Sequence, residues 1–250
     1  MNKAILSVIF LAVIVFIVMK ITPSPIDDIL DNPDRTISDR AKDDLRKPTE
    51  VLTFFGVQPK MKVFDLFSGG GYYSEIVSRI VGEEGQVISH NNQAYLNLVE
   101  KELTARQKDN RLPNIQPLIS EANDITIEPN SLDMVLMILT YHDLHYIDNG
   151  WQAIDTPRLL TEVFKGLKPG GIVGVVDHVA DLGSGLMAAQ TLHRIDPNIV
   201  RAELEAAGFI FDGEIDVLHN EEDPLNIPMF EKSIRGKTDR FVYRFKKPIL

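Results

Sequence analysis

The sequence predicts an α/β fold in which a mostly parallel sheet is covered by helices on both faces. Two observations carry this prediction. Apolar runs typical of strands alternate with amphipathic helical patterns over most of the 250 residues. In addition, residues 62–82 combine a short apolar run, three successive glycines and a helix with regularly spaced apolar positions, which predicts a buried strand, a tight loop and a helix.

The first 21 residues form a segment apart from this fold. Residues 4–19 are apolar except for Ser7, and a lysine lies on either side. A stretch of about this length predicts a membrane anchor through residues 4–21 or a signal peptide. We favour the anchor because no Ala-x-Ala-like cleavage site follows; cleavage would instead give a secreted protein. The aspartates beyond it favour the periplasmic side of an inner membrane, although with so few charges the side stays open.

Residues 22–46 are polar, rich in aspartate and contain proline, which predicts a linker that becomes helical near residues 38–45. Arg40, Asp43 and Arg46 are expected on a solvated helix face, with contact to a ligand as the alternative. The main domain is expected over residues 47–250. It starts with a helix that Pro48 begins and Gly56 ends.

The remainder of the chain continues the alternation. Strands are expected at residues 86–90, 115–119, 132–140, 172–176 and 241–245, and helices at residues 95–106, 159–167 and 197–207. The run at 132–140 is apolar enough for a central strand that is buried on both faces. Asp196 and Pro197 suit the N-cap and first turn of the last helix.

Composition excludes several functions. The formal net charge of −10 argues against a nucleic-acid substrate, because proteins that grip a phosphate backbone present an excess of Lys and Arg, although a local basic patch is compatible with it. The chain has no cysteine, so disulfides, thiolate nucleophiles and cysteine-based zinc sites are excluded.

The glycine loop points to a ligand other than a phosphate. It lacks the Gly-Lys-Ser/Thr ending of a P-loop, and Ser74 occupies the last glycine position of the dinucleotide pattern. The loop resembles instead the first motif of class I S-adenosylmethionine-dependent methyltransferases, in which an acidic residue closes a strand before Gly-x-Gly-x-Gly. Asp65 takes the acidic position, Phe67 stands where the first glycine usually is, and Gly69 and Gly71 take the other two.

Later residues resemble further motifs of this class, and the resemblance runs from about Lys47 to the end. Glu121-Ala122 resembles the acidic-alanine pair that contacts adenine, and residues 131–133 and 167–171 are similar to the segments that open the fourth and fifth strands. Asn91 stands where the family has the acidic residue that binds the ribose hydroxyls. The Gly-Gly-Gly-Tyr-Tyr-Ser, Tyr-His-Asp-Leu-His and Leu-His-Arg-Ile-Asp segments together resemble bacterial predicted methyltransferases with an N-terminal export or anchor segment.

The resemblance implies a three-layer α-β-α Rossmann-like methyltransferase sheet of seven strands, mostly parallel with an antiparallel C-terminal strand. It implies S-adenosylmethionine as cofactor and direct in-line transfer of its methyl group to a small-molecule acceptor. The residues that it places at the cofactor are Asp65, Phe67, Ser68, Gly69, Gly70, Gly71, Tyr72, Asn91, Glu121, Ala122 and Thr140.

Polar clusters follow the fourth and fifth expected strands and precede the last helix. Because ligands of open α/β sheets lie beyond the carboxyl ends of the strands, four of the six histidines, at positions 142, 145, 178 and 193, are expected on one rim. We predict His142, Asp143, His178 and His193 as catalytic residues. His142 is preferred as the general base, with His178 second. Capping of helix ends is the alternative role for these residues.

A metal site is another alternative for the same residues. Catechol-type O-methyltransferases place acidic ligands after these two strands, as Asp143 and Asp177 would be, and oxygen ligands suit magnesium or calcium. Added histidines would suit a transition metal. We favour acid–base roles and predict no metal. The second function that the sequence allows is a non-catalytic membrane-anchored binding protein that retains the fold, which the departures at Phe67 and Asn91 favour.

Overall fold

The computed structural model of the protein describes residues 25–249. The expected membrane segment at residues 4–21 lies outside these residues. Within residues 25–249, no helix is both long and apolar enough to cross a membrane.

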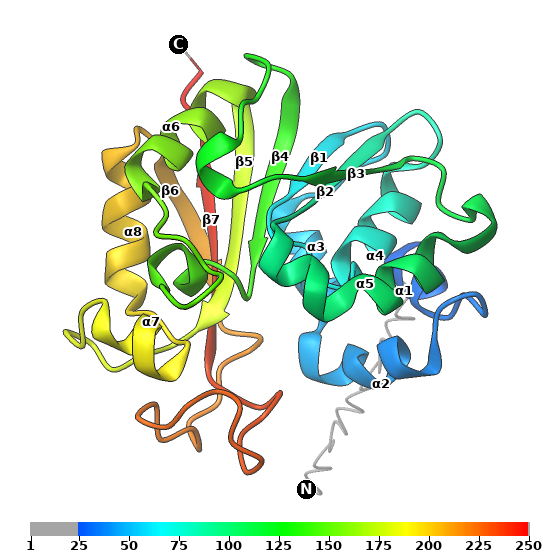
Figure 1. Ribbon diagram of the computed structural model, residues 1–250. Coiled ribbons are helices and arrows are strands. Elements are labelled where there is room, and N and C mark those ends of the chain that lie inside the picture. The colour runs from blue at the N-terminus through cyan, green and yellow to red at the C-terminus, as the bar shows by residue number, and fades with distance from the viewer. Residues whose placement is uncertain (1–24, 250) are drawn as a thin grey trace, which may run out of the picture.

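A seven-stranded sheet runs through the molecule in the order β3-β2-β1-β4-β5-β7-β6 (Figure 1). All neighbouring strands are parallel except β7, which is antiparallel to β5 and β6. This is the mostly parallel sheet with an antiparallel C-terminal strand that the sequence predicted. The strands are β1 (Lys62–Asp65), β2 (Gln86–Asn91), β3 (Ile115–Ile119), β4 (Leu132–Ile138), β5 (Leu167–His178), β6 (Ile210–Ile215) and β7 (Arg240–Lys246).

Helices cover both faces of the sheet and give three layers (Figure 1). One face carries α1 (Pro25–Leu30), α3 (Pro48–Phe55) and α4 (Tyr72–Val81), which share one buried apolar cluster. The opposite face carries α5 (Gln93–Gln107), α6 (Thr156–Gly166) and α8 (Pro197–Ala206), which pack against a second apolar cluster. The sheet therefore has an apolar core on each side, as α/β folds require.

Strand β5 is longer than the sequence predicted. It begins at Leu167 and ends at His178, because β7 pairs with it from Ile172 as far as His178. Asp177 and His178 are thus strand residues at the end of the sheet. Strand β6 and the short helix α7 (Met187–Leu192) were not predicted. Strand β6 lies at the edge of the sheet with every second residue exposed, so it lacks the apolar run of a buried strand.

The segment before the predicted domain also belongs to the folded body. Helix α2 (Ile37–Arg46) is joined to the rest by Asp43, which accepts a hydrogen bond from the Tyr72 hydroxyl at 2.6 Å and pairs with Arg35 at 2.7 Å. Helix α2, helix α7 and residues 216–239, which we call the β6–β7 segment, lie at the end of the sheet where β4 and β5 finish (Figure 1). This edge holds the polar residues singled out above.

Candidate functional site

The glycine loop begins directly at the end of β1. The Ser68 amide donates to the carbonyl of His90 at 2.8 Å, and the Gly71 amide donates to the carbonyl of Ser68 at 3.0 Å. Gly69 and Gly71 have φ of 57° and 78°, a left-handed conformation that glycine adopts without strain. The sequence places glycine here because the chain must reverse before α4 begins.

Helix α5 packs tightly on this loop. A β-carbon on Gly70 would lie 2.0 Å from Oε2 of Glu102, so any larger residue would force the Glu102 side chain to move. Arg106 donates from Nε to the Gly70 carbonyl at 2.6 Å and forms ion pairs with Glu75 and with Asp39, the latter at 2.7 Å. The loop is therefore held by α2, α4 and α5 together.

Asp65 lies buried beneath the loop, where Oδ2 accepts a hydrogen bond from the Ser74 hydroxyl at 2.6 Å. Burial raises the pKa of Asp65 to about 7, although the Ser74 hydrogen bond opposes this. None of the ion pairs in the described part of the chain includes Asp65. The Asp65 carboxyl is therefore buried beneath the glycine loop and does not line the cavity above it.

A cavity of about 170 Å³, which we call the loop cavity, opens above the glycines. Ser68, Gly69, Gly70, Tyr72 and Thr140 line it, as the sequence predicted for a ligand site. Lys42 and Arg46 of α2 and Glu102 and Arg106 of α5 also line it, and the guanidinium of Arg46 lies 4.5 Å from the ring centroid of Tyr72. A backbone cradle with cations beside it suits a ligand that carries a carboxylate.

Phe67 fills the space beside the loop cavity. Its side chain is 2 % exposed, and its ring centroid lies 5.1 Å from that of His90 and 5.4 Å from those of Tyr95 and Trp151. Its φ of 51° is the left-handed conformation of the glycine that it replaces. The chain keeps the shape of the glycine turn and adds a large ring to it.

Asn91 does not face a ligand either. Its side chain is buried, accepts a hydrogen bond from the Gly69 amide at 2.9 Å and donates to Ser68 and Gly69 at 3.1 Å. Asn91 therefore braces the glycine loop, and its contact with ribose stays a prediction. Ala122 is buried in the same apolar cluster as Phe67, and Glu121 accepts a hydrogen bond from the Gln93 amide at 3.4 Å.

These observations test whether the residues fit S-adenosylmethionine. The loop cavity suits the amino-acid end, but pockets for ligands of this size measure about 300–1,000 Å³. With 170 Å³ and the aromatic cluster in place, the loop cavity has no room for adenosine in this conformation. The loop cavity fits the amino-acid end of the cofactor, and the ring of Phe67 has to move before adenosine can enter.

A second cavity of about 470 Å³ adjoins the loop cavity and shares Lys42, Arg46 and Leu139 with it. We call it the basic cavity. The described residues that line it include Lys42, Arg46, Arg235, Arg240 and His178 and no acidic residue. Arg46, Arg235 and Arg240 form no ion pair within residues 25–249. The basic cavity is thus positively charged although the protein carries a net negative charge. Such a cavity attracts anions.

His178 brings a titratable nitrogen to the basic cavity. Nδ1 bonds the hydroxyl of Thr238 at 2.6 Å, whereas Nε2 has no hydrogen bond within residues 25–249. Burial, assisted by the positive charge of neighbouring groups, lowers the pKa of His178 well below its ordinary value. The imidazole is therefore neutral, with a free Nε2, and it is a weaker base than an ordinary histidine.

His142, the base that the sequence favoured, lies deeper. Nδ1 of His142 is 2.8 Å from Oδ1 of Asp177, and its side chain is 1 % exposed. Burial disfavours a charge here, but Asp143 and Asp177 outweigh it and raise the pKa of His142 to about 9. His142 is thus protonated near neutral pH, whereas Nε2 of His178 is free, and the choice of base stays a prediction.

The structure brings three of the four rim histidines together. The ring of His142 lies 5.8 Å from that of His178 and 5.6 Å from that of His193. His145 points elsewhere, because Nε2 is paired with Glu203 at 3.1 Å. Sequence reasoning did not single out Arg235, Thr238 and Arg240, because the β6–β7 segment shows neither helical nor strand periodicity and Arg240 lies one position before the predicted last strand.

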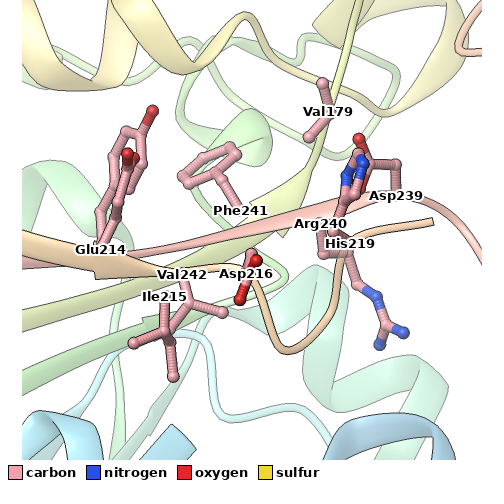
Figure 2. Close-up of a pocket in the computed structure, with 10 residues that line it drawn as sticks. Val179, Glu214, Ile215, Asp216, His219, Asp239, Arg240, Phe241 and Val242 are labelled. Carbon is pink, nitrogen blue, oxygen red and sulfur yellow. The ribbon is translucent and has the colours of Figure 1, made fainter. Parts of the chain in front are cut away.

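A third hollow, of about 570 Å³, is separate from the glycine loop (Figure 2). Glu214, Asp216, His219 and Asp239 line it, and Nδ1 of His219 pairs with Asp239 at 2.9 Å. The guanidinium of Arg240 extends away from this pair in Figure 2. This hollow shares Arg240 with the basic cavity but contains none of the residues that line the loop cavity.

Known protein families and solved structures are similar to this architecture. A family model for protein-L-isoaspartate(D-aspartate) O-methyltransferase matches residues 35–120, which is about a third of the chain. A methyltransferase dependent on S-adenosylmethionine from Aquifex aeolicus is similar in structure, with a TM-score of 0.59 and 24% identity over 92% of this chain and 100% of that one. A second such enzyme, from Mesorhizobium loti, has a TM-score of 0.53 and 13% identity over 80% of this chain and 96% of its own.

The fold is that of the S-adenosylmethionine-dependent methyltransferases. The family match and these neighbours indicate S-adenosylmethionine as the cofactor of this fold. Another neighbour is described as the [4+2]-cyclase SpnF, with a TM-score of 0.57 and 16% identity over 88% of this chain and 86% of that one, so similar structures serve different reactions. Among proteins with curated descriptions, none matches this chain by sequence.

Proposed function

We propose that the protein is an S-adenosylmethionine-dependent methyltransferase that acts on a small anionic acceptor held in the basic cavity. The observation that supports this most is the adjacency of the two cavities. The loop cavity suits the amino-acid end of the cofactor, and the basic cavity shares Lys42, Arg46 and Leu139 with it. A molecule bound in the second cavity is therefore next to one bound in the first.

The basic cavity defines the class of acceptor. Arg46, Arg235 and Arg240 suit a carboxylate or another anionic group, and Leu45, Met229 and Phe230 add apolar surface. Its volume of about 470 Å³ admits a small molecule. An aromatic or aliphatic acid that carries a hydroxyl or amine matches this combination.

The residues of this chain have three tasks in such a reaction. The cofactor, when bound, supplies an electrophilic methyl group. Lys42, Arg46 and the glycine loop hold its amino-acid end, and Arg235 and Arg240 orient the acceptor, so that the two reactants are aligned and shielded from water. Nε2 of His178 receives the proton of an acceptor hydroxyl or amine, because Nδ1 is already engaged by Thr238.

Calorimetry and product analysis test this proposal. We expect the full-length protein to bind S-adenosylmethionine in the micromolar range. We also expect it to release S-adenosylhomocysteine when phenolic or amino carboxylic acids are supplied, but not with the matched amides. His178→Gln should lower turnover about 10²- to 10⁴-fold without changing cofactor affinity. Absence of cofactor binding, or equal turnover of acids and amides, would contradict the proposal.

The closed aromatic cluster favours a second candidate function, a non-catalytic binding protein that retains the fold. Phe67 occupies the adenosine side, and Asn91 is fully used within the loop. The two candidates separate in one experiment with Phe67→Gly. A methyltransferase binds the cofactor in this variant at least as well as the wild type does, whereas a binding protein that has lost the cofactor shows no heat in either form.

The membrane attachment through residues 4–21 is part of the same proposal. It rests on the apolar sequence and its flanking lysines. Fusion of alkaline phosphatase to the C-terminus reports activity only on the periplasmic side, so an inactive fusion of a stable protein would place the domain in the cytoplasm.

A further inference from the structure

Three side chains at the end of β4 and β5 converge on one point. His142 and Asp143 lie in the short helix η3 (His142–His145), and His193 follows α7. One ligand atom from each of the three lies within 4.8 Å of the other two. Nε2 of His142 is 3.4 Å from Oδ1 of Asp143, and Nδ1 of His193 is 3.8 Å from the same oxygen.

A buried nitrogen at this point has an ion-pair contact with Asp143 but no hydrogen bond. Nε2 of His142 makes no hydrogen bond, although the side chain is 1 % exposed. Leaving a buried polar atom unpaired costs about 1–3 kcal/mol, so such an atom calls for an explanation. The nitrogen faces the carboxylate of Asp143, which points to a missing group between them.

Neighbouring residues orient two of the three ligand atoms. Asp177 accepts the His142 amide at 2.8 Å and lies 2.8 Å from Nδ1 of the same residue, so it holds the ring with Nε2 directed at the site, where a metal would take the place of the Nε2 proton. The Tyr95 hydroxyl donates to Oδ2 of Asp143 at 2.6 Å, which leaves Oδ1 for the site. A carboxylate that holds the far nitrogen of a histidine is the usual outer support of a metal ligand.

The third ligand is held between two aromatic rings that contact it at an angle. The ring of His193 lies 4.5 Å from that of Tyr146 and 4.9 Å from that of Phe230. Phe230 also lines the basic cavity. The point of convergence is thus next to the place where we propose that the acceptor binds.

We propose that His142, Asp143 and His193 bind one divalent transition-metal ion through Nε2, Oδ1 and Nδ1. Two imidazoles and a carboxylate suit zinc, iron, cobalt or nickel better than magnesium or calcium. Metal–ligand bonds of about 2.0–2.2 Å place the ligands of a tetrahedral site about 3.3 Å apart. The distances of 3.4 and 3.8 Å from Oδ1 of Asp143 to the two imidazole nitrogens approach this spacing. Three protein ligands leave a fourth position for water or acceptor.

This site differs from the pair of acidic ligands that the sequence suggested as an alternative. Asp177 cannot serve as a ligand here, because Oδ2 accepts the His142 amide and Oδ1 serves both the His142 ring and the His178 amide. Asp177 instead becomes the outer support. His193, which lies 50 residues beyond Asp143 in sequence (193 − 143), supplies the third ligand.

Cobalt titration tests the site without any assay of activity. Full-length protein without a polyhistidine tag, stripped with a chelator and dialysed, is titrated with CoCl₂. We expect visible d–d absorption that saturates at one Co²⁺ per chain. His193→Ala and Asp143→Asn should weaken binding at least tenfold, and Asp177→Asn about 10- to 100-fold. His145→Ala is the matched control, because His145 lies in the same short helix but pairs with Glu203, and it should bind Co²⁺ like the wild type.

Thermal unfolding with Zn²⁺ guards against variants that merely fold poorly. Zn²⁺ should raise the Tm of the wild type and of His145→Ala but not that of His193→Ala, whose side chain is partly exposed and tolerates replacement. A wild type that gives no d–d absorption overturns the proposal, and so does an unchanged titration in a folded His193→Ala protein. Either result would leave a proton, held between Asp143 and Asp177, as the only occupant of the site.

Discussion

The two halves of the candidate site, the loop cavity (the loop half) and the basic cavity (the basic half), are built differently. The loop cavity centres on residues that are close in sequence, the glycine turn at 67–72, to which α2, α5 and the end of β4 add walls, and its adenosine side is closed by Phe67. The basic cavity is open and assembled from α2, the end of β5 and the β6–β7 segment, which are far apart in sequence. In the second half, cations from segments far apart in the sequence meet, and these cations are the reason for proposing an anionic acceptor there.

The largest expected effect concerns Arg194, whose ion pair holds the β6–β7 segment beside the basic cavity. Arg194 is fully buried, pairs with Asp223 at 2.7 Å and donates to the carbonyls of Ile227 and Val179, which ties the β6–β7 segment to β5. Removing one partner of a buried ion pair costs about 3–5 kcal/mol. We expect Arg194→Met to lower the free energy of unfolding by this amount in urea titrations.

The control for this variant is Arg201→Met. Arg201 pairs with Glu205 at 3.0 Å, but both side chains are about half exposed, so its loss should cost under about 1 kcal/mol. Equal destabilisation by the two variants would show that the β6–β7 segment does not depend on the Arg194 pair.

The next effect concerns the buried acid beneath the glycine loop. Because burial raises the pKa of Asp65 from 3.8 to about 7, the folded state binds a proton between these values that the unfolded state has released. Stability contributed by this residue is therefore present at low pH and is lost as the pH rises from about 4 to about 7. Above about pH 7 the stability contributed by Asp65 no longer changes with pH.

Replacement of Asp65 by Asn removes this titration. We expect the free energy of unfolding of Asp65→Asn, relative to wild type, to rise across the window by at most about 4 kcal/mol, since each pKa unit corresponds to 1.36 kcal/mol. Urea titrations at pH 4.5, 6 and 8 measure the difference. Asp181→Asn, at an exposed position, should show no such trend. A flat difference for Asp65→Asn would mean that Asp65 is ionised in the folded protein.

Sequence reasoning located the loop half better than the basic half for a physical reason. The turn after β1 is encoded locally, because glycine is required where φ is positive and where Glu102 lies over Gly70. The closing of this half by Phe67 was not predictable, since it depends on rings from α5 and from residue 151. The positive cavity depends on Arg235 and Arg240, which only the path of the β6–β7 segment brings to α2.

Removal of the ring at position 67 tests whether the loop half is closed to the cofactor. Phe67→Gly restores glycine where φ is 51° and empties the space among His90, Tyr95 and Trp151. We expect calorimetry to show S-adenosylmethionine affinity raised about tenfold or more, which is 1.4 kcal/mol or more. Phe230→Ala removes a ring from the basic half and should leave this affinity unchanged. Weaker binding by a folded Phe67→Gly protein would show that the ring is a wall of the site.

The smallest effect comes from the rim of the basic half. Arg235 is exposed and forms no ion pair within residues 25–249, so its charge is available to an anion but is screened by solvent. We expect Arg235→Gln to weaken binding of 4-hydroxybenzoate, used as the probe, by about two- to fivefold, in line with the small energies of exposed ion pairs. The difference should shrink at high salt, because ions screen exposed charges. Lys232→Gln, which changes a nearby exposed charge that does not line the cavity, should bind the probe like the wild type. If both variants weaken binding equally, the probe responds to the net charge of the segment, and the basic cavity is not where it binds.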